Sequence, residues 1–232
     1  VFLTVTKVPE STNRVKSTIS PIKGIKLMLD NAPFKRLILA FMMGGIAVSI
    51  TTPLYLFFIT YVLNEEDMAI YMLTFFYIST FAAVPFWVWL STIIGKHKAY
   101  IASFMLIGLT HPLYLLLGEG DFWWMLPITI TTGFAAGGFQ ALPNSMKADV
   151  IDIDTLKSGE NRSALFFSTW SFTQKMTASV GSWLALTALA WVGFNTGPEA
   201  YNDSSQLFGL RLLFSSMSSI FYFVAVAIIW KY

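Results

Sequence analysis

Polar side chains recur at helical spacing around one lysine in the middle of an apolar run, residues 165–191. This lysine, Lys175, lies about eleven residues into the run and therefore roughly 16 Å deep at 1.5 Å per residue. An ammonium group near a bilayer centre costs about 2.5 to 3.5 kcal/mol, so it normally faces water or an acid. Serines three or four residues apart fall on the same helical face. That face, which can line a path for a polar solute, contains Ser168, Ser171, Ser179 and Ser182.

Two other interpretations of this face stay open. A lysine can snorkel to the headgroup region, and serines can simply let helices pack closely. The central position of Lys175 favours the wet face. Every Asp and Glu of the chain lies outside the apolar runs, so the partner of Lys175 would be water, a ligand or an acid on helices that this chain does not contain.

A second polar face is expected on the run of residues 122–142 and just beyond it. Gly133 and Gly137 have the small-xxx-small spacing of close helix contacts, and we interpret this face first as a packing surface. Gln140 and Asn144 continue the same face and can reach a cavity. The sequence therefore offers both as candidates for a substrate or cation pathway.

Two further polar residues lie within apolar runs. His111 could relay a proton, although a histidine satisfied by one neighbour is the more common case. Arg211 lies near an outer helix end, where it is expected to snorkel or to pair with Asp203. The chain contains no nucleophile with a base beside it, no phosphate-binding loop and no metal-ligand cluster, and it has no cysteine. We expect neither an enzyme nor a bound cofactor.

The elements that would position these residues are membrane-spanning helices. The chain is 55% hydrophobic and only 12% charged, about half the charged share of a soluble domain. Each of six apolar runs is long enough to cross the hydrocarbon core as one helix. Several lack the polar stripe of a soluble amphipathic helix. The predicted spans are residues 37–61, 69–94, 100–117, 122–142, 165–191 and 207–230.

The charges between these runs predict the topology. Basic residues precede the first run and follow the second, fourth and sixth, whereas the other connections carry acidic residues and no base. Positive charge marks the cytoplasmic side, so both chain ends are expected in the cytoplasm of a multi-pass protein of the plasma or inner membrane. The net charge of +2 then follows from topology, and nucleic acid is not an expected partner.

Residues 1–33 are expected to form a cytoplasmic linker ahead of a six-helix bundle at residues 34–232. Residues 1–5 are apolar and suit the last turn of a preceding helix, and residues 22–29 suit a short surface helix. Asn31 is a candidate N-cap for the first span. Together with the missing acid partner of Lys175, these features favour a chain that lacks an N-terminal half.

The segment between the fourth and fifth spans resembles the glycoside-pentoside-hexuronide:cation symporters, of which the melibiose carrier is the type member. The similar residues run from Met146-Lys-Ala-Asp-Val-Ile-Asp through Gly159 and Arg162 to Phe172-Thr-Gln-Lys175. Weaker similarity at Asn31-Ala-Pro-Phe34 and Gly95-Lys-His-Lys98 extends the resemblance over essentially the whole chain. It implies helices seven to twelve of a major facilitator superfamily fold.

The resemblance also implies roles for individual residues. Lys175 would lie beside the central cation and sugar sites, and Asp149, Asp152 and Arg162 would belong to an inner gate. The absent half would supply the acids that bind the coupling cation, Na+ or H+. Asn144 stands where many relatives have an aromatic residue, so the sugar selectivity of the family does not carry over.

We therefore expect a secondary active transporter that couples a cation to the uptake of a sugar or a related small solute. Alternatives are a carrier of lipids or other solutes in the same superfamily, a proton-coupled exporter using His111, and a scaffold or receptor that transports nothing. The lipid bilayer is a partner in every case.

Overall fold

The computed structural model describes residues 31–197 and 201–232, and all regular structure within them is helical. The linker predicted at residues 1–33 lies almost wholly outside the described residues, as does the surface helix predicted at 22–29. Asn31 is the N-cap of the first described helix, where its side-chain oxygen accepts a hydrogen bond from the Phe34 amide at 3.2 Å.

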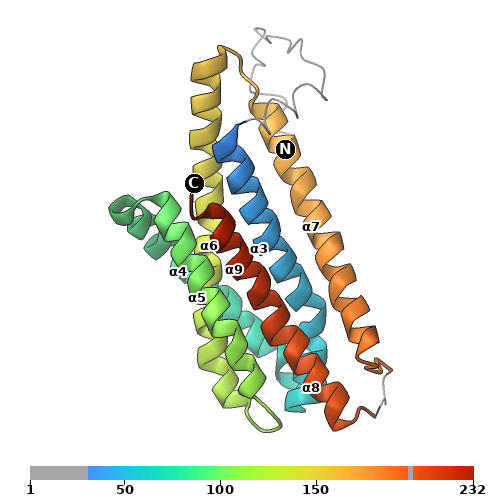
Figure 1. Cartoon of the computed structure of the whole chain (residues 1–232). Helices are drawn as coiled ribbons and strands as arrows, with labels where there is room; N and C mark the ends of the chain where they lie inside the picture. The colour runs from blue at the N-terminus through green and yellow to red at the C-terminus, as the bar shows by residue number, and fades with distance from the viewer. Residues whose placement is uncertain (1–30, 198–200) are drawn as a thin grey trace, which may run out of the picture.

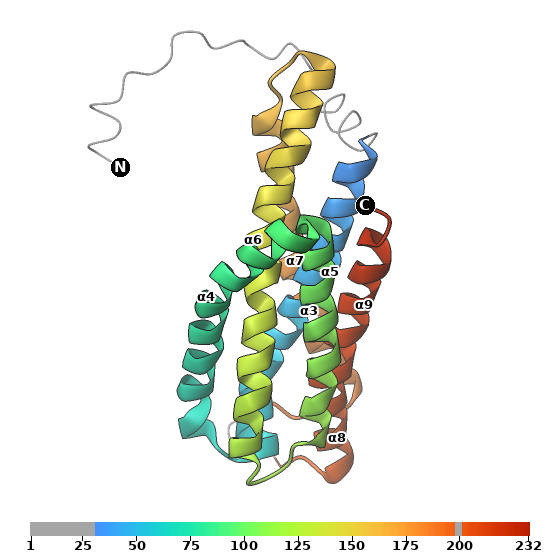
Figure 2. The same ribbon diagram turned by 90° about the vertical axis from the view of Figure 1, so that its left-hand side faces the viewer.

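Six helical rods alternate in direction, as the sequence predicts (Figures 1 and 2). Four of them contain a short segment of different winding, at one end or within the rod, and remain continuous. The bounds are α3 Ala32–Phe57 with the π-helix η1 Phe58–Leu63; η2 Glu66–Met68 and α4 Ala69–Ile94; α5 Lys96–Thr110 with the 3-10 helix η3 His111–Leu116; α6 Phe122–Ser158; α7 Ser163–Trp191; and α8 Ser204–Leu212, the π-helix η4 Leu213–Met217 and α9 Ser218–Ile229.

Helix α6 differs most from the sequence prediction. The predicted fourth span covers residues 122–142, but α6 continues through Pro143 to Ser158. Proline removes only one backbone donor, and the residues after it bury Met146, Val150 and Ile151 at helical spacing. Gly159 ends α6 in the left-handed conformation with φ 69°.

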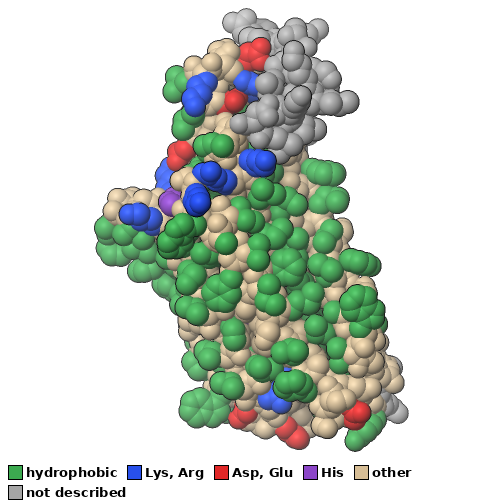
Figure 3. All heavy atoms as spheres, viewed as in Figure 1, with side chains coloured by type: hydrophobic (Ala, Val, Ile, Leu, Met, Phe, Trp, Pro, Cys, Tyr) green, Lys and Arg blue, Asp and Glu red, His purple; other side chains and the backbone are tan. Residues whose placement is uncertain are grey.

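Four of the six rods are long and apolar enough to cross a membrane. The other two, α6 and α7, are 37 and 29 residues long, but their polar residues lower the mean hydropathy. Figure 3 shows hydrophobic side chains over the middle of one face of the molecule, with charged side chains towards its upper and lower ends. The chain is thus an all-α membrane protein. We call the end with Lys96 and Lys231 the inner end, following the predicted topology.

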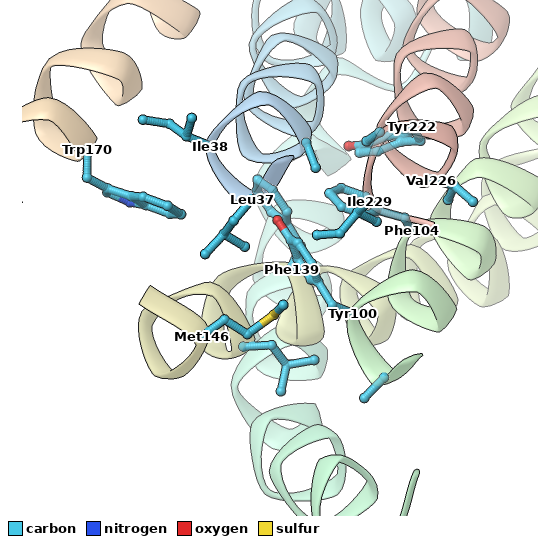
Figure 4. Close-up of a cluster of buried hydrophobic side chains, with 14 of the residues drawn as sticks. Leu37, Ile38, Tyr100, Phe104, Phe139, Met146, Trp170, Tyr222, Val226 and Ile229 are labelled. Carbon is cyan, nitrogen blue, oxygen red and sulfur yellow. The ribbon is translucent and has the colours of Figure 1, made fainter. Parts of the chain in front are cut away.

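The helices pack in a fixed spatial order: α4, α6, α5, α9, α3 and α7. Two clusters of buried side chains fill the bundle, one in the inner half and one in the outer half. The inner cluster brings together Tyr100 and Phe104 from α5, Phe139 from α6 and Tyr222 from α9 (Figure 4). The same cluster includes Leu37 and Ile38 of α3, so it also connects α3 to α6.

Candidate functional site

The bundle has one open face, between α4 and α7. These two helices stand at the ends of the packing order, and neither packs extensively against the other. α3 and α6 lie between them and form the floor of the open face. Side chains of α7 that point away from α3 therefore have no helix of the described residues to pack against.

Helix α7 directs its polar stripe away from the bundle. It packs on α3 through a buried face that includes Trp170, Thr173 and Thr177. Lys175 and Ser171 lie on a different face, and both are exposed. Within the described part of the chain, the side chain of Lys175 has neither an ion pair nor a hydrogen bond, so its ammonium group is available to a ligand or a partner helix.

The serines of the stripe do not all behave alike. Ser168 and Ser179 are exposed and donate to carbonyls of their own helix, Leu165 at 2.9 Å and Lys175 at 3.2 Å. Ser182 instead donates to the Ser49 carbonyl of α3 at 3.4 Å. The packing interpretation thus applies to the outer end of the stripe, which contacts α3. The part around Lys175 stays open, as the wet-face interpretation expects.

Helix α6 divides its polar face in a similar way. Gly133 and Gly137 pack against α4, where an added Cβ would meet the Phe76 carbonyl oxygen at 2.5 Å and the Thr80 carbonyl oxygen at 2.7 Å. The packing role predicted for the two glycines is confirmed. Gln140 is exposed on the same helix.

The structure adds Lys147, whose part in this face the sequence did not suggest. Lys147 is only 5% exposed, and its Nζ lies 4.5 Å from the ring centre of Phe167 and 4.8 Å from that of Trp170 on α7. It also donates to Asn144 Oδ1 at 3.3 Å. The π electrons of the two rings stabilise this cation, so Lys147 joins α6 to α7 at the inner end.

This contact fixes the relative depth of the candidate residues. Gln140 lies seven residues outward from Lys147 along α6, or roughly 10 Å at 1.5 Å per residue. Lys175 lies five and eight residues outward from Trp170 and Phe167 along α7, a mean of about 10 Å. Gln140 on the floor of the open face and Lys175 on the α7 side therefore lie at a similar depth.

The three inner-gate candidates contact different partners. Asp149 accepts from Lys96 Nζ at 2.6 and 2.8 Å, which ties α6 to the start of α5. Arg162 lies 3.2 Å from Asp154 in a nearly buried pair that closes the α6–α7 hairpin. Asp152 is exposed. The three side chains do not form a single cluster in this structure.

The two remaining intramembrane polar residues lie away from the polar stripe. His111 is buried among the rings of Tyr114, Phe214 and Tyr222, with centroids 5.4 to 6.1 Å away. Arg211 does not pair with Asp203, contrary to one of the two expectations. It donates through Nη2 to the Leu115 carbonyl at 2.9 Å, because Asp203 is engaged as the N-cap of α8.

A family of carriers accounts for this combination of six rods, an open face and an intramembrane lysine. The model of the MFS/sugar transport protein family matches residues 1–232. The chain belongs to this family. Members of the major facilitator superfamily are transporters, in agreement with the superfamily predicted from the residues between the fourth and fifth spans.

Relatives that are similar to this chain include carriers named for lipids and a symporter whose substrate is not named. The sodium-dependent lysophosphatidylcholine symporter 1-A of Danio rerio is 27% identical over 209 residues, 88% of this chain and 38% of the relative. The sphingosine-1-phosphate transporter MFSD2B of Xenopus tropicalis is 22% identical over 214 residues, 90% of this chain and 41% of the relative. The uncharacterized symporter YjmB of Bacillus subtilis is 25% identical over 202 residues, 85% of this chain and 42% of the relative. The chain spans about two fifths of the length of these relatives.

Proposed function

We propose that this chain forms one bundle of a sodium-coupled carrier for an amphipathic lipid with a charged headgroup. The observation that carries the proposal is the contrast between the two walls of the open face, one apolar and one polar with a central cation. The lipid substrates named for the vertebrate relatives support the same class of solute. This moves our preference from a sugar to the lipid alternative.

The apolar wall is α4. This helix packs on α6 through Thr80, Ala83 and Trp87, and Phe86 contacts Phe134 of α6 on one flank at a ring distance of 5.0 Å. The other flank carries apolar residues at helical spacing, which suit contact with an acyl chain. They are Ile70, Leu73, Tyr77 and Val88, with exposed fractions of 62, 36, 48 and 48%.

The polar wall is α7, with Gln140 of α6 at the same depth. Lys175 supplies a positive charge that a phosphate or phosphodiester group can neutralise. Ser171 and Ser179 lie within one turn of it and supply hydroxyl groups. A lipid lying across the open face would place its headgroup on α7 and its tail on α4, so that each part meets a surface of its own polarity.

A second six-helix bundle is the natural cover for this face. An exposed lysine in mid-membrane is costly in lipid, and the relatives are more than twice as long as the part that this chain matches. In carriers of this kind the substrate and coupling-ion sites lie between two bundles, which rock about them. We propose that residues 34–232 rock in this way and that acids of the second bundle bind the sodium ion.

The alternative substrate is a sugar or a related polar solute. The family description names sugar transport, and Gln140, Asn144 and the α7 serines are suitable hydrogen-bond partners for hydroxyl groups. A sugar, however, leaves the apolar flank of α4 without a role in binding. Uptake of a lysophospholipid and of a disaccharide by the same vesicles would decide between them.

The test is uptake by the full-length carrier reconstituted in vesicles with an imposed sodium gradient. We expect wild type to move a labelled lysophospholipid and Lys175→Ala to lose at least tenfold in sodium-dependent uptake while inserting normally. Lys98→Ala, which removes an exposed lysine at the start of α5, is the matched control and should transport normally. Normal uptake by Lys175→Ala would remove the role of this residue.

A scaffold that transports nothing is tested separately. This chain has no cysteine, so its own residues add no background to single cysteines introduced into it. Cysteine at Ser171 or Ser179 should react with a water-soluble maleimide, and lysophospholipid should slow the reaction. Cysteine at the buried Thr177 is the unreactive control. If neither Ser171 nor Ser179 reacts as cysteine, water does not reach this face, and the result favours a scaffold over a transporter.

A further inference from the structure

A cavity lined by an arginine and a glutamate opens at the outer end of the bundle. It lies far from the inner end, where Lys147 joins α6 to α7. Its volume is about 360 Å³, within the roughly 300 to 1,000 Å³ of small-molecule pockets. Three segments form it: η1 with the following turn, the loop between η3 and α6, and α8. The lining residues are Thr60, Tyr61, Val62, Asn64, Gly118, Glu119, Leu207 and Arg211.

Arg211 is the one basic residue in the outer half of the described chain. Its Nη2 donates to the Leu115 carbonyl at 2.9 Å, at the end of the 3-10 helix η3. Its Nε is buried without a hydrogen-bond partner, and no carboxylate of the described residues lies within ion-pair distance. Capping one carbonyl uses one of five guanidinium donors, so a helix-capping role alone leaves most of this group unused.

Glu119 lines the same cavity and carries the opposite charge. Its Oε1 accepts a weak hydrogen bond from Asn64 Nδ2 at 3.4 Å. The carboxylate does not pair with Arg211, although both line one cavity. Two opposite charges that are held apart in this way are complementary to a ligand that carries both charges, because each can bind its counterpart without first breaking an internal ion pair.

We propose that this cavity binds the zwitterionic headgroup of a phospholipid or lysophospholipid on the outer side of the membrane. The phosphate contacts Arg211, whose planar guanidinium can bind two phosphate oxygens at once. The ammonium group contacts Glu119, and Val62 and Leu207 offer apolar surface to the glycerol end. The identity of the lipid class rests on the proposed function. The cavity would be an initial binding site that the headgroup occupies before it reaches Lys175.

Binding is measured without transport, on the full-length carrier in a maltoside detergent, which has neither a phosphate nor an ammonium group. Isothermal titration with phosphocholine is compared with choline chloride and with inorganic phosphate. We expect phosphocholine to bind at least tenfold more tightly than either single-charge probe. Arg211→Ala should weaken phosphocholine and phosphate binding tenfold or more.

A second variant keeps the test independent of folding, because Glu119 is exposed. Glu119→Gln should weaken phosphocholine binding severalfold and leave phosphate binding equal or tighter. Glu66→Gln removes an exposed outer carboxylate that does not line the cavity and should change nothing. Equal affinity for phosphocholine and phosphate, or phosphocholine binding unchanged in both Arg211→Ala and Glu119→Gln, would overturn the site.

This outcome is separable from that of the proposed function. Sodium-dependent lysophospholipid uptake that needs Lys175, combined with no phosphocholine binding in the outer cavity, rejects the cavity site alone. Phosphocholine binding that needs Arg211, in a carrier that moves only sugar, rejects the proposed substrate and keeps the site.

Discussion

Lys147 Nζ lies 4.8 Å from the centre of the Trp170 ring, and this contact joins two helices whose backbones pack little against each other. Phe167 covers the same ammonium group at 4.5 Å. Lys147 is buried, and no carboxylate of the described residues pairs with it. Its stabilisation therefore comes from the aromatic rings and from the hydrogen bond to Asn144 Oδ1.

Replacement of Lys147 should loosen the inner end of α7. We expect Lys147→Ala to lower the free energy of unfolding by about 2 kcal/mol, the size of a desolvated cation–π contact, whereas Lys147→Arg should retain most of the stability. The thermal midpoint of the purified carrier, followed by tryptophan fluorescence, measures the change. A Lys147→Ala protein as stable as Lys98→Ala would argue against the contact.

Gly133 should tolerate no larger residue. Alanine in place of a helical glycine normally stabilises by up to about 1 kcal/mol, but at Gly133 the new Cβ would meet the Phe76 carbonyl at 2.5 Å. We expect Gly133→Ala to destabilise by about 1 to 3 kcal/mol through overpacking. Gly108→Ala is the control, because its Cβ meets the movable Phe223 ring at 3.3 Å and the Tyr222 Cβ at an ordinary 3.4 Å. The two variants should change the thermal midpoint by clearly different amounts, and equal effects would contradict the close α4–α6 contact.

The two inner-end ion pairs should differ in their contribution to stability. Lys96 and Asp149 keep 38 and 50% of their side chains exposed, whereas Arg162 and Asp154 keep only 10 and 13%. Breaking an exposed pair costs about 0 to 1 kcal/mol, and breaking a nearly buried one costs more because a charge is left unpaired. Asp154→Asn should therefore lower the thermal midpoint more than Asp149→Asn. The reverse order would mean that the pairs were ranked wrongly.

The variant Asp149→Asn also tests the proposed inner gate. If Asp149 belongs to an inner gate, Asp149→Asn should alter the sodium-dependent uptake rate by severalfold at nearly unchanged stability. An uptake rate equal to that of wild type would exclude a gating role for Asp149 and leave only its surface ion pair with Lys96.

Asp203 should make the start of α8 sensitive to acid. Its Oδ1 accepts from the backbone amides of Gln206 and Ser205 at 2.9 Å each, and the Gln206 bond contributes most to holding the pKa of the carboxyl below its usual range. Because the pKa is lower in the folded state, the cap stabilises fully above the unfolded pKa of about 3.9. This contribution is lost as the pH falls through the folded value.

The non-titrating variant Asp203→Asn isolates this effect, since asparagine is also a good N-cap. Between about pH 6 and pH 3, wild type should lose more thermal stability than Asp203→Asn. Parallel loss in the two proteins would assign the acid sensitivity to other carboxylates.

Much of the architecture follows from local sequence. In a bilayer every backbone polar group must be satisfied internally, so six apolar runs predict six helical rods, and the second rod has the predicted bounds Ala69–Ile94. Helical periodicity likewise predicts that Lys175 and Ser171 share a face and that Gly133 and Gly137 face a neighbour. These properties depend only on residues within a few turns of one another.

The partners of the polar groups were decided by tertiary structure alone. Periodicity gives the face on which a side chain lies but not the helix that covers it. The sequence therefore missed the aromatic cover of Lys147 and offered Asp203 as one possible partner of Arg211, which instead donates to the Leu115 carbonyl. The stripe around Lys175 stays open for the same reason, since α7 packs on α3 and no described helix lies beyond it.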